Sequence, residues 1–410
     1  MKLLILTQYF PPETGAPQNR LYELALRLQA NGVEITVLTA MPNYPKMEIF
    51  PAYEGKKTMV EEMDGMTVHR TSIYVTKSKS ISKRLRNYFS FVYSSRKYGK
   101  RLGNFDYILC ESPPLFLGYS AMSLSKKLNA KLIFNVSDLW PESAEKLGMV
   151  TNRTFLNMAY RLEARCYRNA TLITGQTQGI VSDIKKRFPD SQVHWLPNGV
   201  DISNYDPNKI EAAGFREQYH LAKDDILLFY GGILGHAQGL EIIIKAAEKF
   251  KHRSEVKFIL MGSGPLKDEL IALSNKLKTD NVIFAEPVAR TEIGKVIKEI
   301  DVSIIPLRKL PLFLGAIPSK IFEILAMKKP ILLGVQGEAK ELFIDDGKAG
   351  WAFEPENVNE LVAQIEKIID RPELLKEFGE NGRRYVGEKF DRNNHAQALL
   401  ELLESNLEKR

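Results

Sequence analysis

The sequence has very little cysteine. Its 410 residues include two, Cys110 and Cys166, and each lies in an apolar run. Two isolated thiols cannot build the disulfide framework of a small secreted domain, and they fit buried thiols in a reducing cytoplasm. No histidine, cysteine or carboxylate group shows the spacing of a metal site, so we expect neither a metal nor another cofactor.

Long apolar runs are also missing. No stretch of about 18 uncharged apolar residues occurs, so the sequence predicts no membrane-spanning helix. The first residues, Met1 to Gln8, turn polar too soon for a signal peptide and predict a buried strand. A chain of this length with 44% hydrophobic residues predicts a globular protein with two domains.

Acidic residues are absent between Asp64 and Asp106. The basic residues of this interval are Arg70, Lys77, Lys79, Lys83, Arg84, Arg86, Arg96, Lys97, Lys100 and Arg101. Aromatic residues interleaved with them include Tyr88, Phe89, Phe91, Tyr93 and Tyr98. Residues 1–200 hold 27 Lys and Arg against 16 Asp and Glu, whereas residues 201–410 hold 30 against 34. The first half therefore carries the positive charge, and we expect an anionic partner there.

A helix predicted in this interval, from a cap at Ser82 to about Leu102, combines basic and aromatic residues. Such a helix suits an anionic membrane surface, and the expected contact residues are Lys83, Arg84, Arg86, Tyr88 and Phe89. The alternative is a solvated basic face, which charge runs usually form. Nucleic acid is not expected as a partner, because no nucleic-acid-binding motif accompanies the charge.

A G-x-G-x-x-G dinucleotide fingerprint is absent, but strands and helices alternate. A strand at 2–7, a loop with Gly15, a helix at 17–30 and a strand at 33–39 predict a parallel sheet. Further strands are expected at 66–75, 106–110, 131–136, 170–174 and 193–196. After a turn at 197–201 the alternation restarts, with strands at 226–230, 256–261, 282–285 and 302–306 and glycine loops at 231–239 and 262–264. The sequence therefore predicts two α/β domains.

The stretch 317–330 predicts a helix that is mostly buried. Pro318 suits its first position and Pro330 its end. Lys320 and Glu323 are three residues apart and share a face, so they can form an ion pair at the rim of the core. The alternative is a ligand site, in which the helix N-terminus and Lys320 bind phosphate and Glu323 accepts both hydrogens of a ribose diol. Diphosphate and ribose together indicate a nucleotide-sugar.

Asp138 follows the predicted strand 131–136. Ligands of open parallel sheets bind beyond the carboxyl ends of the strands, so Asp138 is placed for chemistry. The alternative is a loop carboxylate that caps the next helix.

Several of these stretches together resemble family 4 retaining glycosyltransferases. The nucleotide-binding helix of that family is similar to Pro318–Ala326 followed by Lys329, Pro330 and Ile331. The Asp-x-Trp-Pro run at Asp138–Ser143, the turn Asn198–Asp201 and the loop at Ala237–Leu240 resemble it too. The most similar subgroup is bacterial and transfers N-acetylated amino sugars during surface polysaccharide assembly. The resemblance implies the α/β GT-B fold, with two facing Rossmann-like domains at 1–198 and 199–388, an active cleft between them, and a terminal helix at 389–410 that crosses back.

The resemblance also implies a set of site residues. The donor would contact Gly15, Gly232, Gln238, Gly264, Val288, Arg290, Ser319, Lys320 and Glu323. The catalytic roles would fall to Lys320 at the departing diphosphate and to Asp138 at the acceptor. The chain departs from the family at Gly315, where the family has a second Glu, and at Ile233 and Gln238, where it has Arg and Lys. We therefore expect Lys320 to supply the charge that those loop cations supply elsewhere.

The implied activity is retaining and metal-independent. A sugar, expected to be an N-acetylated amino sugar, would move from a UDP donor to a lipid-linked or saccharide acceptor. The expected place is the cytoplasm, peripheral at the inner face of the plasma membrane. Two alternatives stay open: a nucleotide-sugar epimerase on the same architecture, and a non-catalytic nucleotide-sugar-binding protein.

Overall fold

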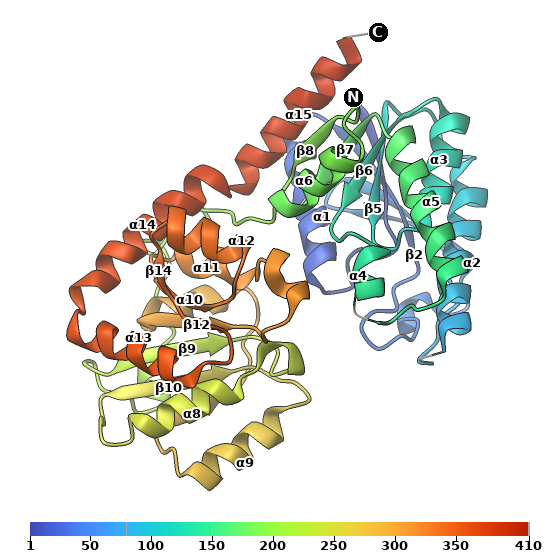
Figure 1. The fold of residues 1–410 in the computed structure, drawn as a ribbon. Helices are drawn as coiled ribbons and strands as arrows, with labels where there is room; N and C mark the ends of the chain where they lie inside the picture. Colours follow the sequence, from blue (N-terminus) through green and yellow to red (C-terminus); the bar gives the residue numbers. More distant parts are fainter. Residues whose placement is uncertain (79, 147, 409–410) are drawn as a thin grey trace. The chain divides into compact units, whose positions relative to one another are not determined.

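The computed structural model describes residues 1–78, 80–146 and 148–408. The chain divides into two compact units (Figure 1). The first comprises Met1–Asn198 and Asn393–Arg410, and the second comprises Gly199–Arg392. Each unit contains a β-sheet covered by helices, as the predicted alternation of strands and helices requires.

The first unit contains an eight-stranded sheet in the order β3-β4-β2-β1-β5-β6-β7-β8. Neighbouring strands are parallel, except for the antiparallel pair of β3 and β4. The strands are β1 (Lys2–Leu6), β2 (Glu34–Ala40), β3 (Thr58–Met63), β4 (Met66–Thr71), β5 (Tyr107–Ser112), β6 (Lys131–Val136), β7 (Leu172–Gly175) and β8 (Val193–Trp195).

Both faces of this sheet are buried, so β1 is apolar throughout. Leu4 and Leu6 pack in one core with α2, α3, α5 and α6, whereas Leu3 and Ile5 pack in another with α1 and α15. This is the alternation of side chains across a strand that is covered on both faces. The helices are α1 (Ala16–Ala30), η1 (Pro51–Tyr53), α2 (Ile81–Gly99), α3 (Leu117–Leu128), α4 (Glu142–Lys146), α5 (Arg153–Asn169), α6 (Gln178–Arg187) and α15 (Arg392–Glu408).

The hairpin of β3 and β4 was not predicted. Asp64 and Gly65 join the two strands with φ angles of 48° and 79°. Such angles at both central residues favour the Asp-Gly pair, which is a strong signal for a two-residue hairpin. The strand expected to reach residue 75 ends at Thr71, so β3 and β4 form a short ribbon at the edge of the sheet.

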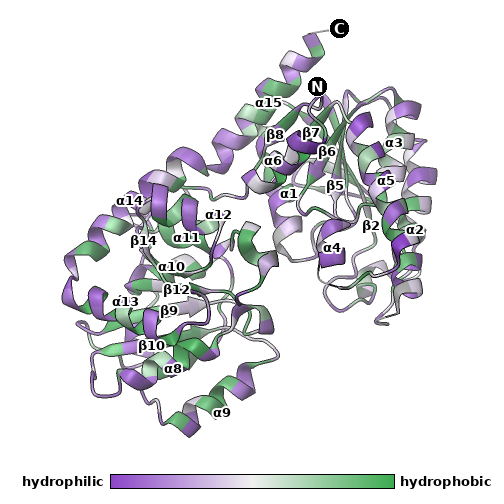
Figure 2. Ribbon diagram, in the orientation of Figure 1, coloured by the Kyte–Doolittle hydropathy of each residue, from purple (hydrophilic) through white to green (hydrophobic). Residues whose placement is uncertain are grey.

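The second unit contains a six-stranded parallel sheet in the order β11-β10-β9-β12-β13-β14. The strands are β9 (Ile226–Gly231), β10 (Val256–Met261), β11 (Val282–Ala285), β12 (Val302–Pro306), β13 (Ile331–Gly334) and β14 (Gly350–Ala352). The helices are α7 (Phe215–Gln218), η2 (His236–Gln238), α8 (Glu241–Lys249), α9 (Lys267–Leu277), α10 (Ile293–Glu299), η3 (Pro311–Gly315), α11 (Lys320–Ala326), α12 (Glu338–Lys340), η4 (Glu341–Asp346), α13 (Val358–Asp370) and α14 (Glu373–Lys389). Figure 2 shows α8 as largely hydrophobic, in line with its buried isoleucines.

Two helices differ in extent from the prediction. Helix α11 begins at Lys320 rather than at Pro318, and it ends at Ala326, well before Pro330. Its end is set by Lys328, which adopts a left-handed φ of 58° and stops the helical path. Helix α2 has Ser80 rather than Ser82 at its N-cap position.

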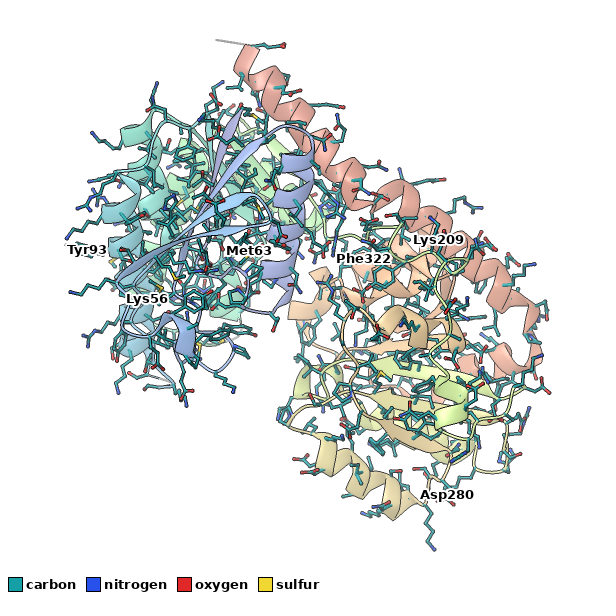
Figure 3. All side chains as sticks on the ribbon, turned by 180° about the vertical axis from the view of Figure 1, so that it is seen from behind. Lys56, Met63, Tyr93, Lys209, Asp280 and Phe322 are labelled. Atoms are coloured by element: carbon teal, nitrogen blue, oxygen red, sulfur yellow. The ribbon has the colours of Figure 1, made fainter. Side chains whose placement is uncertain are left out.

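Helix α11 is short but well buried. Ile321, Phe322, Ile324 and Leu325 are at most 3% exposed, and the Phe322 ring packs against two further buried phenylalanines, Phe343 and Phe390. Figure 3 labels Phe322 within this packed region of the second unit. The apolar residues thus fix the helix in place and leave Lys320 and Glu323 on its remaining side. Among the described residues, no helix is long and apolar enough to span a membrane.

Candidate active site

A pocket of about 380 Å³ opens in the second unit. It lies where β9 and β10 end, beside the point at which the strand order reverses between β9 and β12. In open parallel sheets this switch point is the usual ligand position. The lining residues are Phe229, Gly231, Gly232, Ile233, Met261, Gly262, Ser263, Pro287, Val288, Arg290, Ile293, Ile297, Ser303, Lys320, Glu323 and Ile324.

Two glycine loops form one wall of the pocket. Gly232 and Gly262 have φ angles of 144° and 147°, which side-chain-bearing residues rarely adopt. A Cβ atom on Gly262 would lie 1.8 Å from the carbonyl oxygen of Gly232. Glycine is therefore required here for the two loops to touch, and their backbone is exposed to whatever occupies the pocket.

Lys320 lies opposite these loops. Its Nζ atom is 3.8 Å above the centre of the Tyr230 ring and 2.8 Å from the position of a Cβ atom on Gly232. Among the described residues its ammonium group has no carboxylate partner. Burial lowers the pKa of Lys320 to about 7, and the charge of Glu323 offsets this only in part. The pocket thus contains an amino group that can carry a positive charge and that forms no ion pair with a carboxylate of the described residues.

Glu323 does not pair with Lys320. Its carboxylate lies 3.9 Å from the Arg290 guanidinium and interacts with the hydroxyl of Tyr205. Burial and the Glu323 charge hold the pKa of Tyr205 above its usual value. Because the Glu323 side chain is still 25% exposed, its carboxylate remains open to a ligand hydroxyl. The ion pair of Lys320 with Glu323, one of the two predicted alternatives, is not formed.

The pocket brings together five of the predicted donor residues, which are Gly232, Val288, Arg290, Lys320 and Glu323. Gln238, Gly264 and Ser319 are outside its lining. Gln238 ends η2 near Gly235, Gly264 packs on the backbone of Leu234, and Ser319 precedes α11. The part of the predicted donor site that lies in the pocket therefore includes Lys320, Glu323 and the glycine loop at Gly232.

The structure adds one pocket residue, Ser303, and two residues that contact the pocket side chains, Tyr230 and Tyr205, all of which the sequence analysis missed. Tyr230 is buried beneath Lys320, and Tyr205 reaches Glu323 from a position 118 residues away along the chain. Ser303 is fully buried, and its hydroxyl has no hydrogen-bond partner among the described residues. No sequence motif marks these three, because their places at the pocket depend on segments that are distant in the sequence. A pocket with glycine loops in its wall, a lysine and a carboxylate suits a ligand that carries phosphate and sugar hydroxyls.

The first unit has a different arrangement at the carboxyl ends of its strands. Arg20 on α1 donates to Glu111 (2.6 Å), to the Ser137 hydroxyl (2.6 Å) and to Gln176 (2.9 Å). Ser137 and Asn135 also donate to the Glu111 carboxylate. These residues follow or end β5, β6 and β7, so one buried arginine ties the three strand ends together.

Asp138 lies next to this network. It is half-buried, and its carboxylate accepts a hydrogen bond of 2.7 Å from the hydroxyl of Ser143 in α4. Gly15 lies in the first unit too, as the N-cap residue of α1 with an extended φ of 179°. The structure thus places both residues at the carboxyl-end side of the first sheet. In the part of the chain that the structure describes, no group of three or more metal-ligating side chains is found.

The predicted membrane residues belong to α2. Lys83, Arg84, Arg86 and Phe89 are exposed, and Phe89 is 43% exposed beside Phe116. Tyr88 instead packs partly against the core of the first unit. The exposed part of this helix is therefore basic with two large exposed aromatic side chains, Phe89 and Tyr93, and Figure 2 shows its alternation of hydrophilic and hydrophobic residues.

Two family models match the chain and together span most of it. The model described as "Glycosyltransferase Family 4" matches residues 18–204, and the model described as "Glycosyl transferases group 1" matches residues 213–385. The chain is 25% identical over 403 residues to a relative from Escherichia coli K12 named for colanic acid biosynthesis, the glycosyl transferase WcaI. The match covers 96% of this chain and 97% of WcaI.

Solved structures share the fold. Sucrose-phosphate synthase from Thermosynechococcus elongatus matches with a TM-score of 0.75 and 16% identity over the full length of both chains. HepE from Anabaena, solved with UDP and glucose, matches with a TM-score of 0.70 and 19% identity, over 99% of this chain and all of HepE. The fold and family predictions are confirmed: the chain belongs to the glycosyltransferases with the GT-B fold, its first half matching family 4 and its second half group 1.

Proposed function

We propose that the chain transfers an N-acetylated amino sugar from a UDP donor to a lipid-linked saccharide during surface polysaccharide assembly. The observation that carries the proposal is the pocket of the second unit, in which Lys320, Glu323 and the Gly232 loop meet. Support for UDP comes from HepE, whose structure was solved with UDP and glucose. Support for polysaccharide assembly comes from the relative named for colanic acid biosynthesis.

In this proposal the donor is held through its diphosphate and its ribose. The backbone of Gly232 and Ser263 approaches the phosphate oxygens, and the Lys320 ammonium neutralises them. Glu323 accepts hydrogen bonds from the ribose hydroxyls, with Arg290 and Tyr205 fixing its carboxylate. Val288 and Pro287 border the base on the apolar side of the pocket.

Transfer proceeds with retention and without a metal ion. As the bond between sugar and diphosphate breaks, negative charge grows on the leaving oxygen, and Lys320 stabilises it. The acceptor hydroxyl attacks from the same face and gives its proton to that leaving oxygen. No separate base is needed, and Asp138 orients the acceptor hydroxyl from the first unit.

The acceptor would be brought to the enzyme by the membrane. The exposed Lys83, Arg84, Arg86 and Phe89 of α2 would dock the first unit on the inner face of an anionic bilayer. A lipid-linked acceptor would then meet the enzyme at the bilayer surface.

A turnover assay tests the function. Purified protein is incubated with UDP-N-acetylglucosamine, UDP-N-acetylgalactosamine or UDP-glucose, and with a polyprenyl-diphosphate-linked sugar, with and without EDTA. We expect transfer of an N-acetylated sugar that persists in EDTA and gives an α-linked product by NMR.

Other results would favour the alternatives. Interconversion of donors without an acceptor would identify an epimerase. Donor binding detected by a raised melting temperature, with no turnover for any acceptor, would identify a non-catalytic binding protein.

A further inference from the structure

The first unit contains a second large groove, of about 610 Å³, that the proposed transfer does not use. It runs between α2 and the ribbon of β3 and β4. One wall is a single face of α2 from Ser90 to Tyr98, a length of about 12 Å at 1.5 Å per residue, and Arg101 extends this wall beyond the end of the helix. The other wall includes Lys57 and Thr58 at the start of β3. The groove is therefore elongated and suits an extended ligand.

The charge of the groove is positive and is not neutralised by the protein. Lys57, Lys97 and Arg101 line it and are exposed, and no acidic residue is among the lining residues. None of the three cations has a carboxylate partner among the described residues. Because a groove lined by charges of one sign concentrates the electrostatic field, these three cations attract an anionic ligand.

The rest of the lining consists of tyrosines and small hydroxyl residues. Tyr93 is 68% exposed, and Tyr98 and Tyr74 are partly buried. Figure 3 labels Tyr93 at the outer edge of the first unit. The hydroxyls of Ser90 and Ser94 are already bonded to backbone groups of the segment that follows β4, so they shape the floor rather than attract charge. Tyrosine rings offer flat apolar faces with a polar edge, which suits sugar rings.

We propose that this groove binds an acidic saccharide chain, that is, an oligosaccharide whose sugars carry carboxylates. The sugar rings lie against Tyr93 and Tyr98, and the carboxylates pair with Lys97, Arg101 and Lys57. A bilayer surface fits less well, because the cations line a concave groove rather than a convex face. No glycine loop is present in the lining to receive a phosphate group closely.

Calorimetric titration of the full chain tests the proposal with two probes of equal length, hexagalacturonate and the neutral maltohexaose. We expect binding of hexagalacturonate only, weakening as salt is raised. The double variant Lys97→Ala with Arg101→Ala should weaken it at least tenfold, and Tyr93→Ala should weaken it severalfold.

The matched control is Arg96→Ala with Lys100→Ala. This variant removes two exposed positive charges, one from α2 and one from its C-cap residue, but neither residue lines the groove. It should change the affinity less than twofold, and melting temperatures check that every variant folds. The assay contains no nucleotide-sugar, so its outcome is independent of the transfer proposed above.

Three outcomes would overturn the proposal. Equal losses in the two double variants would mean that the whole helix attracts anions without a defined site. Binding of maltohexaose with the same affinity as hexagalacturonate would show that the carboxylates of the ligand do not contribute. Binding of a hexathymidylate or of phosphatidylglycerol vesicles that depends on Lys97 and Arg101, with no binding of hexagalacturonate, would assign the groove to another class of ligand.

Discussion

The carboxyl ends of the two sheets differ in how their buried charges are satisfied. In the first unit Arg20 and Glu111 pair with each other and with neighbouring polar groups, and their side chains are 10% and 4% exposed. In the second unit Lys320 faces a pocket without a carboxylate partner among the described residues. An ion pair within the protein stabilises the fold. A buried charge without an ion-pair partner costs stability, and it favours a bound ligand of opposite charge.

The largest expected effect comes from breaking the paired site. Glu111→Ala should lower the free energy of unfolding by about 3–5 kcal/mol, because it leaves Arg20 buried without its carboxylate. Urea denaturation measures the change. The control is Glu34→Ala, which removes an exposed partner of Lys2 and should cost under about 1 kcal/mol. If Glu111→Ala lowered the free energy of unfolding no more than Glu34→Ala does, the pair of Arg20 and Glu111 would not stabilise the fold.

The unpaired site should respond in activity rather than in stability. Lys320→Ala should reduce turnover at saturating donor by about 10²–10³-fold, since it removes a group that stabilises the developing charge. The donor dissociation constant should change less. The control is Lys267→Ala, which removes a lysine outside the pocket that pairs with Glu286. Wild-type turnover in Lys320→Ala would mean that the glycine loops bind the phosphates without it.

The two units also differ in charge, because the first half of the chain carries the excess of positive charge. Binding to anionic liposomes tests what this charge does. Reversing Lys83, Arg84 and Arg86 to Glu should abolish sedimentation with anionic liposomes, because each base near such a surface contributes about 1 kcal/mol. The wild-type protein should bind anionic but not neutral vesicles, and less at high salt. Binding that does not depend on lipid charge would favour the alternative interpretation, in which these residues form a solvated basic face.

Glu323→Gln should weaken donor binding by about 1.5–3 kcal/mol, the value of a hydrogen bond to a charged group. Titration calorimetry with the UDP-sugar measures it. A dissociation constant equal to that of the wild type would leave Glu323 with only its structural contacts to Arg290 and Tyr205.

The smallest effect is a pH dependence of donor affinity. The pKa of Lys320 is lowered to about 7 by burial, and a bound diphosphate favours the protonated form. Affinity should therefore be greatest below about pH 7 and fall above it, by at most tenfold per pH unit. The neighbouring Tyr230 has a raised pKa and stays neutral in this range. A Lys320→Met variant should show a flat profile between pH 6 and 9.

Strong local patterns made the fold predictable. The buried strands 131–136, 256–261 and 302–306 were predicted with their observed bounds, because continuous apolar runs bounded by polar or glycine turns have few alternatives. Helix α11 was predicted too long, since its end depends on the left-handed Lys328 and not on Pro330. The ribbon of β3 and β4 has an Asp-Gly pair at its turn, which is a local sequence signal for a hairpin.

Only those site residues that lie together in one short sequence motif were predictable. Lys320 and Glu323 lie in one short stretch, and both line the pocket. Tyr205 reaches Glu323, and Arg20 reaches Glu111, across 118 and 91 residues of sequence. Such pairs have no periodic or local signature, because folding alone brings them together.

The division of the chain has a consequence for its synthesis. Residues 1–198 form the first unit only together with α15, whose Ala396, Leu399, Leu400 and Leu403 complete one of its cores. The Tyr107 hydroxyl also donates to the carbonyl of Leu403 (2.8 Å). A ribosome adding 5–20 residues per second needs roughly 10–40 s to make the 194 residues between these two pieces. During that interval the core that contains Leu3 and Leu28 lacks the side chains of α15, while the continuous second unit can fold as soon as it emerges.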